Sequence, residues 1–314
     1  MSTAILNTIG SEFTIYAGSF LFLLGFSGNL ITIYLFRTTR HTPITFILII
    51  LSIVNCISLI VGLLNRVLVA IVGIDPILLS PIWCKLRVYL GQTTVLICQS
   101  CACLASINCF LSTCRLIRWR RLVSLSISRQ CIFILVIFWI LHGLFNPCLT
   151  KLITATGKSS TCSLTNLIAS NYTAFFLRPV LVGIFPICIL SVFGLLTHRN
   201  LQQLRHKRRF EQQPICKMLL LQMIAYVLGT LPYASFYAYQ SITSAIRIKS
   251  TIELAQESLV LNFINIIFYM PQSSPFYIYY LSSKTFRKQI KDFLICYQQH
   301  NRIQPLVRTI NEKH

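Results

Sequence analysis

The sequence contains seven apolar stretches that are each long enough to cross a lipid bilayer. A membrane-spanning helix needs about 20 consecutive, mostly apolar residues. Stretches of this kind run over residues 13–36, 44–65, 83–113, 131–150, 173–197, 216–241 and 257–281. Their apolar residues are continuous and do not alternate with a period of two, which argues against an outer-membrane β-barrel. The sequence therefore predicts an all-α membrane protein, built as a seven-transmembrane helix bundle.

The composition agrees with a chain embedded in lipid. Of its 314 residues, 55% are hydrophobic and only 11% are charged, whereas soluble domains carry about 25% charged residues. The 28 Lys and Arg residues against 7 Asp and Glu residues give a formal charge of +21. A nucleic-acid-binding protein can share such a charge, but this chain has too few charged residues to cover a soluble surface. We therefore expect no nucleic-acid partner.

The positive charge indicates the topology of the chain. Loops on the cytoplasmic side of membrane proteins carry an excess of Lys and Arg. With the amino terminus outside, 20 of the 28 basic residues fall on the cytoplasmic side. The other eight are Arg66, Lys85, Arg87, Lys151, Lys158, Arg178, Arg247 and Lys249. We expect a multi-pass plasma-membrane protein with its amino terminus outside and its carboxyl terminus in the cytoplasm.

This topology divides the chain into four parts. They are an extracellular amino terminus (1–12), the bundle (13–281), a short amphipathic eighth helix (282–296) and a cytoplasmic tail (297–314). In the eighth helix, Phe286, Ile290 and Phe293 recur at helical spacing, which is typical of a helix lying on the membrane surface. Cys296 follows this helix as a candidate lipidation site. The basic inner segments are expected to rest on anionic membrane lipids or to contact a protein partner.

The acidic residues argue against several functional classes. All seven lie in expected loops, tails or span ends, whereas ion-coupled transporters and pumps place ionisable groups at mid-membrane depth. The cysteines inside the spans have no neighbouring histidine that would complete a metal site. We expect neither an enzyme nor a bound cofactor or metal. A seven-helix transporter or channel stays open as a less favoured alternative.

Residues at matched places in the seven stretches carry a family resemblance. Gly28 and Asn29 lie in the first stretch, Asn55 in the second, and Cys84 opens the third. Further markers are Trp139, Pro186, Pro232, Ser274, Pro275 and Tyr279. In this order and spacing they resemble the rhodopsin-like family of G-protein-coupled receptors, over about residues 15–296. The chain is identified as a divergent member of that family.

The resemblance implies a disulfide between Cys84 and Cys162, which would join the third helix to the second outer loop. Cys148 stays open as a rival partner for Cys84, although it lies at the end of the fourth stretch. The sequence Asn171-Tyr172-Thr173 in the same outer region is an N-glycosylation motif. Asn171 is therefore a candidate glycosylation site.

The chain departs from the family at the positions of its activation switch. Asn108, Cys109 and Phe110 stand where the family has Asp-Arg-Tyr, so the acid and the Arg are both missing. Losing them together leaves neither charge buried and unpaired. Thr230 stands at the place of the sixth-helix Trp, and Asn55 replaces an Asp. These departures predict either coupling through an altered switch or a receptor-like protein with weak or no coupling.

The seventh stretch admits two alignments with the family's Asn-Pro-x-x-Tyr motif. In one alignment Ser274 takes the place of the Asn. If Phe286 sets the register instead, Pro275 falls in the Asn place and Tyr279 becomes the motif Tyr. The sequence leaves both alignments open.

The outer halves of the stretches suggest which ligand the chain binds. Gly91 stands where amine receptors carry an Asp, which argues against an amine ligand. The outer polar and aromatic candidates are Gln92, Arg178, Tyr233, Tyr237, Gln240 and Glu257. Such groups favour a peptide ligand, which presents many donors and acceptors. They can equally serve as membrane-interface and interhelical contacts. As an expectation, the chain is a receptor that binds an extracellular peptide and engages a G protein or arrestin inside the cell.

Overall fold

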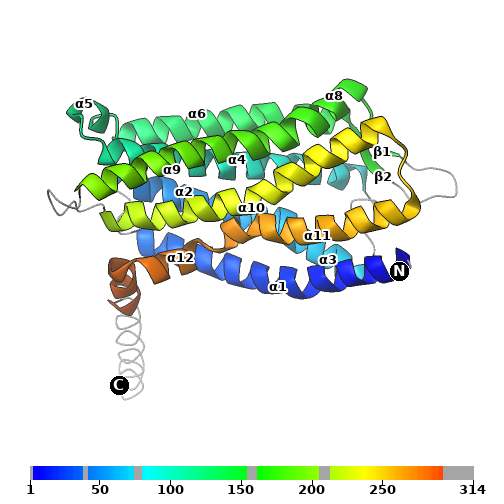
Figure 1. The fold of residues 1–314 in the computed structure, drawn as a ribbon, viewed down its shortest axis with the longest axis horizontal. Helices are drawn as coiled ribbons and strands as arrows, with labels where there is room; N and C mark the ends of the chain where they lie inside the picture. Colours follow the sequence, from blue (N-terminus) through cyan, green and yellow to red (C-terminus); the bar gives the residue numbers. More distant parts are fainter. Residues whose placement is uncertain (1–2, 38–41, 74–79, 154–160, 205–212, 293–314) are drawn as a thin grey trace, which may run out of the picture.

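The computed structural model of the chain describes residues 3–37, 42–73, 80–153, 161–204 and 213–292. Within these residues, seven helices are long and apolar enough to cross a membrane. They run side by side along one axis and form a single bundle (Figure 1). The predicted seven-helix bundle is confirmed.

Several of the seven membrane-crossing helices consist of more than one element. The first four comprise α1 (Thr3–Phe36), α2 (Pro43–Ser58), the π-helix η1 (Leu59–Leu64), α3 (Asn65–Val72), α4 (Pro81–Thr113), α6 (Leu125–Gly143) and α7 (Phe145–Leu149). The last three comprise α8 (Leu167–Asn171), the π-helix η3 (Tyr172–Ile184), α9 (Phe185–Leu204), α10 (Gln213–Ile246) and α11 (Thr251–Ser273). Short elements complete the fold: α5 (Ile117–Arg120), β1 (Thr150–Ile153), β2 (Thr161–Leu164) and α12 (Pro275–Ser282).

The helix starts follow from the local sequence. Thr42, Ser80 and Ser124 precede α2, α4 and α6, and each side chain accepts a hydrogen bond from a backbone amide three residues later. Such caps satisfy amides that have no partner inside the helix. Pro43 and Pro81 occupy first helical positions, where a missing amide hydrogen costs nothing.

The first helix begins earlier than the apolar pattern predicts. It starts at Thr3, within the residues 1–12 that were expected to form an amino-terminal extension. Its 34 residues correspond to about 50 Å at about 1.5 Å per residue, which exceeds a hydrocarbon core of about 30 Å. The helix therefore extends beyond the apolar layer at one end or both.

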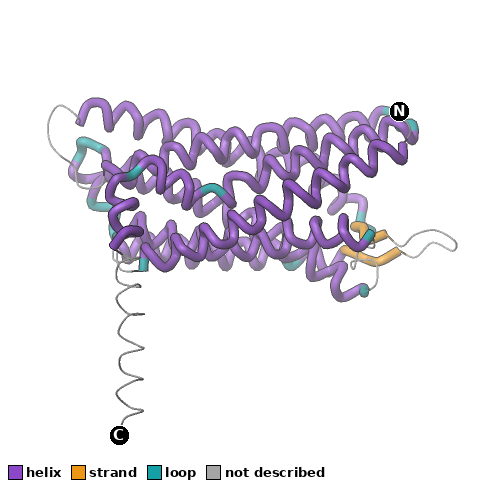
Figure 2. The backbone as a smooth tube through the Cα atoms, turned by 90° about the horizontal axis from the view of Figure 1, so that it is seen from below, coloured by secondary structure: helices purple, strands orange, loops and turns teal. Residues whose placement is uncertain are grey.

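The strands β1 and β2 form an antiparallel hairpin, in which Leu152 pairs with Cys162. The disulfide between Cys84 and Cys162 joins this hairpin to the first turn of α4. We call this end of the bundle the disulfide end, and the end that carries α12 the opposite end. The two ends lie at the far extremes of the long axis, and Figure 2 shows the hairpin from below.

A proline pair interrupts the seventh membrane-crossing helix. α11 ends at Ser273, and α12 starts at Pro275 after a single non-helical residue, Ser274. Because Pro275 has no amide hydrogen, the carbonyl of Pro271 loses its helical partner. This carbonyl instead accepts a hydrogen bond of 2.6 Å from Gln222 Nε2 on α10. The break therefore links the seventh helix to the sixth.

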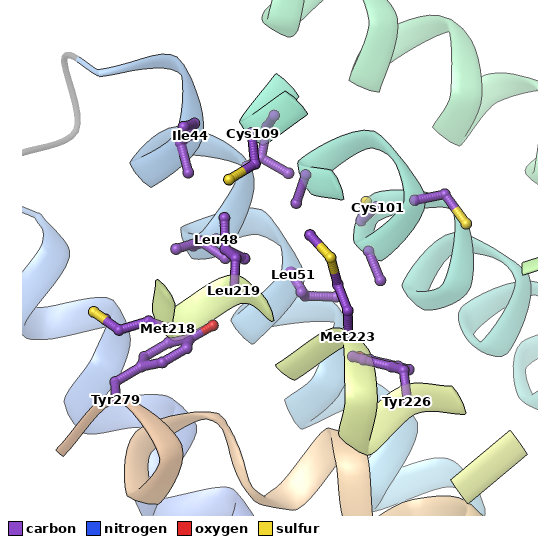
Figure 3. Close-up of a cluster of buried hydrophobic side chains, with 14 of the residues drawn as sticks. Ile44, Leu48, Leu51, Cys101, Cys109, Met218, Leu219, Met223, Tyr226 and Tyr279 are labelled. Carbon is purple, nitrogen blue, oxygen red and sulfur yellow. The ribbon is translucent and has the colours of Figure 1, made fainter. Parts of the chain in front are cut away.

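The opposite half of the bundle holds the largest apolar core. Figure 3 shows its side chains meeting between α2, α4, α10 and α12. The labelled members are Ile44, Leu48, Leu51, Cys101, Cys109, Met218, Leu219, Met223, Tyr226 and Tyr279. Because membrane helices gain little from hydrophobic transfer between one another, such close contacts are what hold them together.

The expected eighth helix follows α12, with Ser283 between the two helices. Residues 284–292 are helical, and the structure describes the chain no further than residue 292. Phe286 is 2% exposed, and its ring packs against Phe36, Phe276 and Tyr279. The described part of this helix is therefore anchored to α1 and α12 by aromatic contacts. The predicted extension to residue 296 and the tail 297–314 lie outside the described residues.

Candidate ligand cavity and switch region

A cavity of about 580 Å³ opens at the disulfide end. Volumes of about 300–1,000 Å³ are typical of small-ligand sites. Residues from five of the seven membrane-crossing helices line it, together with Thr150, Cys162 and Leu164 of the hairpin. The disulfide thus fixes the hairpin directly beside the cavity.

Three arginines from three different helices line this cavity: Arg66 on α3, Arg87 on α4 and Arg178 on η3. The guanidinium group of Arg66 lies beside the hydroxyl of Tyr269. The guanidinium carbon of Arg178 lies 4.8 Å from the ring centroid of Tyr237, within the range of a cation–π contact. These two guanidinium groups therefore contact neutral aromatic side chains.

Arg87 is positioned by an amide. With the Asn65 amide turned so that its oxygen faces α4, this oxygen accepts hydrogen bonds from the Arg87 guanidinium at 2.7 to 3.2 Å. Arg66, the residue after Asn65 in α3, also lines the cavity. α3 and α4 therefore each present one guanidinium group to the same space.

No acidic side chain is found among the described residues that line the cavity. The two nearest acids along the chain to its seventh-helix wall are engaged at the start of α11. Glu257 forms an ion pair of 2.5 Å with Lys249, and both side chains are nearly buried. Glu253 pairs with Arg247 at 3.0 Å and also caps α11 through the Ser250 amide. Both acids therefore already have cationic partners outside the cavity wall.

Three of the lining side chains are buried polar groups without a hydrogen-bond partner in the described part of the chain. They are Asn265, through its amide nitrogen, and Thr150 and Thr173, through their hydroxyls. Asn265 is 3% exposed, Thr150 is 1% exposed and Thr173 is 9% exposed. Buried polar groups are normally paired, and an unpaired one typically costs about 1–3 kcal/mol. Each of these groups can donate a hydrogen bond.

The cavity includes most of the ligand-contact candidates that were predicted from the sequence. Gln92, Arg178, Tyr233 and Tyr237 line it. Gln240 and Glu257 do not appear among its described lining residues. Glu257 is instead held by Lys249. Gln240 lies farther along α10, near the helix end, where its carbonyl accepts from Thr243.

Sequence reasoning missed several lining residues. Arg66 and Arg87 stood out only as basic residues on the expected outer side, and this signal was sufficient to nominate them. Asn265 and Tyr269 lie in the seventh helix among apolar neighbours, and their direction could not be read from one sequence. Thr173 was visible only as part of the glycosylation motif. Asn171 of that motif is exposed at the end of α8.

The disulfide pair is the one that the family resemblance implied. Cys84 and Cys162 are bonded, with their Cα atoms 6.0 Å apart. Cys148, the alternative partner, is a free and exposed cysteine in α7. Cys296, the lipidation candidate, lies outside the described residues.

A polar network connects helices in the middle of the bundle. Asn29 Nδ2 donates to the carbonyls of Gly25, at 2.7 Å, and Gln272, at 2.9 Å. Asn55 Nδ2 donates to Asn29 Oδ1 at 3.3 Å, and the Tyr226 hydroxyl donates to Asn55 Oδ1 at 3.4 Å. The network joins α1, α2, α10 and α11 with neutral groups alone. Tyr226, which is 1% exposed, was not predicted as a member.

Of the expected switch positions on α4, Asn108 and Cys109 are buried and Phe110 is half-buried. Cys109 is fully buried and hydrogen-bonded to Cys216 of α10. Asn108 Nδ2 donates to the Leu104 carbonyl at 3.0 Å, and Asn108 Oδ1 accepts from Ser128 Oγ of α6 at 3.5 Å. Phe110 packs on Phe193, with 5.5 Å between ring centroids. These side chains fill the junction of α4 with α6, α9 and α10, and the position of Cys109 carries no charge.

The other family markers have specific neighbours. Trp139 Nε1 donates to Ser100 Oγ at 2.8 Å, which joins α6 to α4. Thr230 Oγ1 accepts from Gln99 at 3.3 Å, which joins α10 to α4. Pro232 lies inside α10, and the buried Pro186 lies in the first turn of α9, directly after the π-helix η3.

Around the seventh-helix motif, Tyr279 is the inward side chain. It is 1% exposed, and its ring lies 5.9 Å from Phe36 and 5.8 Å from Phe286. Ser274 is half-buried at the break, and Pro275 is buried. Both alignments of the seventh-helix motif stay open.

The sequence matches no model of a known protein family and no curated protein.

Proposed function

We propose that this chain is a rhodopsin-like G-protein-coupled receptor that binds an extracellular ligand, with a peptide favoured, in the cavity at the disulfide end. The observation that carries the proposal is the cavity itself, of about 580 Å³, lined by five helices and by a hairpin tied to α4. A site at the meeting point of several helices, closed on one side by a fixed loop, suits a receptor that responds to a ligand from outside.

The contacts of the family-marker residues support this assignment. Asn29, Asn55 and Trp139 each bridge two helices through hydrogen bonds. The resemblance implies this interhelical role for Asn29, and neutral polar bridges are a common means of joining membrane helices. Tyr279 and Phe286 pack together where the seventh and eighth helices meet.

The proposed topology places the disulfide end outside the plasma membrane and α12 in the cytoplasm. It is supported by the 20 of 28 basic residues that fall on the α12 side in the sequence. A disulfide also forms most readily on the oxidising, outer side of a cell membrane. The opposite end then meets a G protein or arrestin.

The junction around Cys109 favours a second candidate, which is a receptor-like protein that binds its ligand and couples weakly or not at all. Cys109 is fully buried against Cys216, so this position presents no cation to a partner. Coupling would then depend on other contacts at the helix ends.

The test is an agonist screen with a peptide library on cells that express the receptor, read by reporters for several G-protein classes. The proposal predicts that at least one peptide gives a response that untransfected cells lack. A Cys109→Arg variant separates the two candidates. If the wild type responds normally, the weak-coupling candidate is wrong, and if only the variant responds, the altered switch has lost coupling.

A flux assay addresses the transporter alternative. Purified protein in proteoliposomes is expected to give no more uptake of ions or amino acids than empty liposomes. Ligand-independent flux above that background would overturn the receptor proposal.

A further inference from the structure

The cavity at the disulfide end concentrates positive charge. Arg66, Arg87 and Arg178 come from the second, third and fifth membrane-crossing helices, and all three line one space. These three residues lie far apart in the sequence, so it is the fold that brings them to one cavity. No carboxylate lines that space within the described ranges. The described lining therefore carries the positive charge of Arg66 and Arg178.

The contacts of Arg66 and Arg178 orient their guanidinium groups but do not neutralise them. Arg66 lies beside a tyrosine hydroxyl, and Arg178 lies over a tyrosine ring. Arg66 is half-buried, whereas Arg178 is exposed. A partly buried cation beside low-dielectric walls attracts an anion more strongly than an exposed cation does, so this effect applies to Arg66. Each guanidinium also presents several donors in a planar fork, which matches the geometry of a carboxylate.

A second observation is independent of charge. The amide nitrogen of Asn265 and the hydroxyl of Thr173 are buried in the cavity wall without a partner among the described residues. Asn265 comes from α11 and Thr173 from η3, so these donors face the cavity from two sides. A ligand rich in acceptors would remove the cost of both unpaired groups.

The rest of the lining suits an apolar or aromatic body. The rings of Tyr233 and Phe268 stack with centroids 4.3 Å apart, and Tyr233 also lies 4.5 Å from Tyr237. Leu177 and Val182 of η3 line the same cavity. Such a surface contributes contact area, whereas the arginines supply orientation.

The geometry points to an acidic ligand, which binds with a carboxylate held between Arg66 and Arg178 and with an apolar or aromatic body against Tyr233 and Phe268. This inference rests on the proposed function, because it names the chemistry of the ligand for the same cavity. The carboxylate belongs either to a peptide, at its carboxyl terminus or an acidic side chain, or to a small organic acid.

The experiment measures binding without relying on signalling. The full-length receptor is purified, and its thermal unfolding midpoint is recorded with two sets of matched probes. One set consists of short peptides with aromatic residues, each made as a free acid and as its terminal amide. The other consists of aromatic and aliphatic carboxylic acids, each paired with its methyl ester.

The inference predicts that acids from at least one set raise the midpoint and that their amide or ester partners do not. A response from the peptide set identifies a peptide source, and a response from the organic-acid set identifies a small-molecule source. Arg66→Gln and Arg178→Gln should each weaken the affinity of the best acid by at least about tenfold, which is the range expected for a lost charge-assisted hydrogen bond. Arg178→Lys, which keeps the charge but loses the fork, should fall between the wild type and Arg178→Gln.

Two further variants guard against a trivial loss of folding. Arg247→Gln removes an arginine that pairs with Glu253 outside the cavity wall, and it should bind the acid like the wild type. Arg178→Glu should lose the acid and gain stabilisation from the matching amine, in which an ammonium replaces the carboxylate. A gained preference cannot arise from a misfolded cavity.

Equal stabilisation by the acids and their uncharged partners, or by neither, would overturn the inference. So would an agonist whose potency is unchanged in both Arg66→Gln and Arg178→Gln. The latter result would leave the receptor function standing. Conversely, acid binding that depends on both arginines but gives no G-protein response would support the inference while the proposed signalling function fails.

Discussion

The two ends of the bundle are held together in different ways. At the disulfide end, the helices enclose a cavity, and charged groups and a covalent bond fix its surroundings. In the opposite half, apolar side chains and neutral hydrogen bonds fill the space between the same helices. The first end depends on a few discrete links, whereas the second depends on many close contacts.

This difference has a physical reason. A cavity removes the packing contacts that would otherwise join helices, so the surrounding helices need links that act across a gap. The Cys84–Cys162 bond supplies such a link, and the Lys249–Glu257 pair holds the connection between α10 and α11 to α11. Substitutions at the two ends should consequently differ in size and kind.

The largest effect is expected from the ion pair at the start of α11. Lys249→Met leaves Glu257 nearly buried without its cation, which should lower the free energy of unfolding by about 3–5 kcal/mol. Thermal unfolding of the purified protein measures the change. The double variant Lys249→Met/Glu257→Gln should recover much of the loss, because no unpaired charge remains. The matched control Arg247→Gln breaks an exposed pair and should leave the midpoint unchanged.

The disulfide should have the next largest effect. Cys84→Ser releases the β1–β2 hairpin from α4, and the bond closes a span of 78 residues. The expected loss is about 2–4 kcal/mol, read as a lower unfolding midpoint that a reducing agent does not lower further. Cys148→Ser changes a free cysteine and should behave like the wild type. An equal response of the two variants would contradict the assigned role of the hairpin.

The tightness of packing in the two halves can be compared directly at two glycines. A Cβ atom added at Gly25 would lie 2.8 Å from the backbone Cα of Ser273, whereas one added at Gly91 would meet nothing within 4 Å. Gly25→Ala should therefore cost about 1–3 kcal/mol through overpacking, and Gly91→Ala, in the cavity wall, should cost almost nothing. Unfolding midpoints of the two variants test this, and a tolerant Gly25 would mean that α1 and α11 separate easily.

The smallest effect is expected in the neutral network. Tyr226→Phe deletes one hydrogen bond to Asn55 and keeps the ring in place. Interhelical hydrogen bonds of this kind average about 0.6 kcal/mol, with a maximum of about 1.7. Tyr16→Phe, at a side chain that is 72% exposed, is the matched control. A loss well above that range would show that the network acts as one unit and not as separate pairs.

The architecture was readable from the sequence because lipid imposes a simple length rule. Each apolar stretch of about 20 residues or more became a membrane-crossing helix. The boundaries were less predictable. Residues 3–12, which lie before the first apolar stretch, continue the first helix, and Ser274 separates α11 from α12. Both outcomes depend on local backbone hydrogen bonding, which average hydropathy does not report.

The site was only partly readable. The direction in which a side chain points is set by helix rotation, and an all-round apolar helix gives little indication of it. Arg178, Tyr233 and Tyr237 were placed correctly among the lining residues, while Gln240 and Glu257 lie elsewhere. The convergence of Arg66, Arg87 and Arg178 is a property of three helices at once. A single sequence contains no signal for it beyond the presence of three basic residues on one side.

The break at Ser274 makes this residue a hinge. Its amide still donates to Met270 of α11, while its carbonyl already accepts from Ile278 of α12. Rotation about the φ and ψ angles of this residue therefore reorients α12 without disturbing the hydrogen bonds inside either segment. α11 carries the cavity residues Asn265 and Tyr269, and α12 carries Tyr279. The wall of the cavity and the aromatic cluster at the opposite end thus lie on two helical segments that meet at a single non-helical residue.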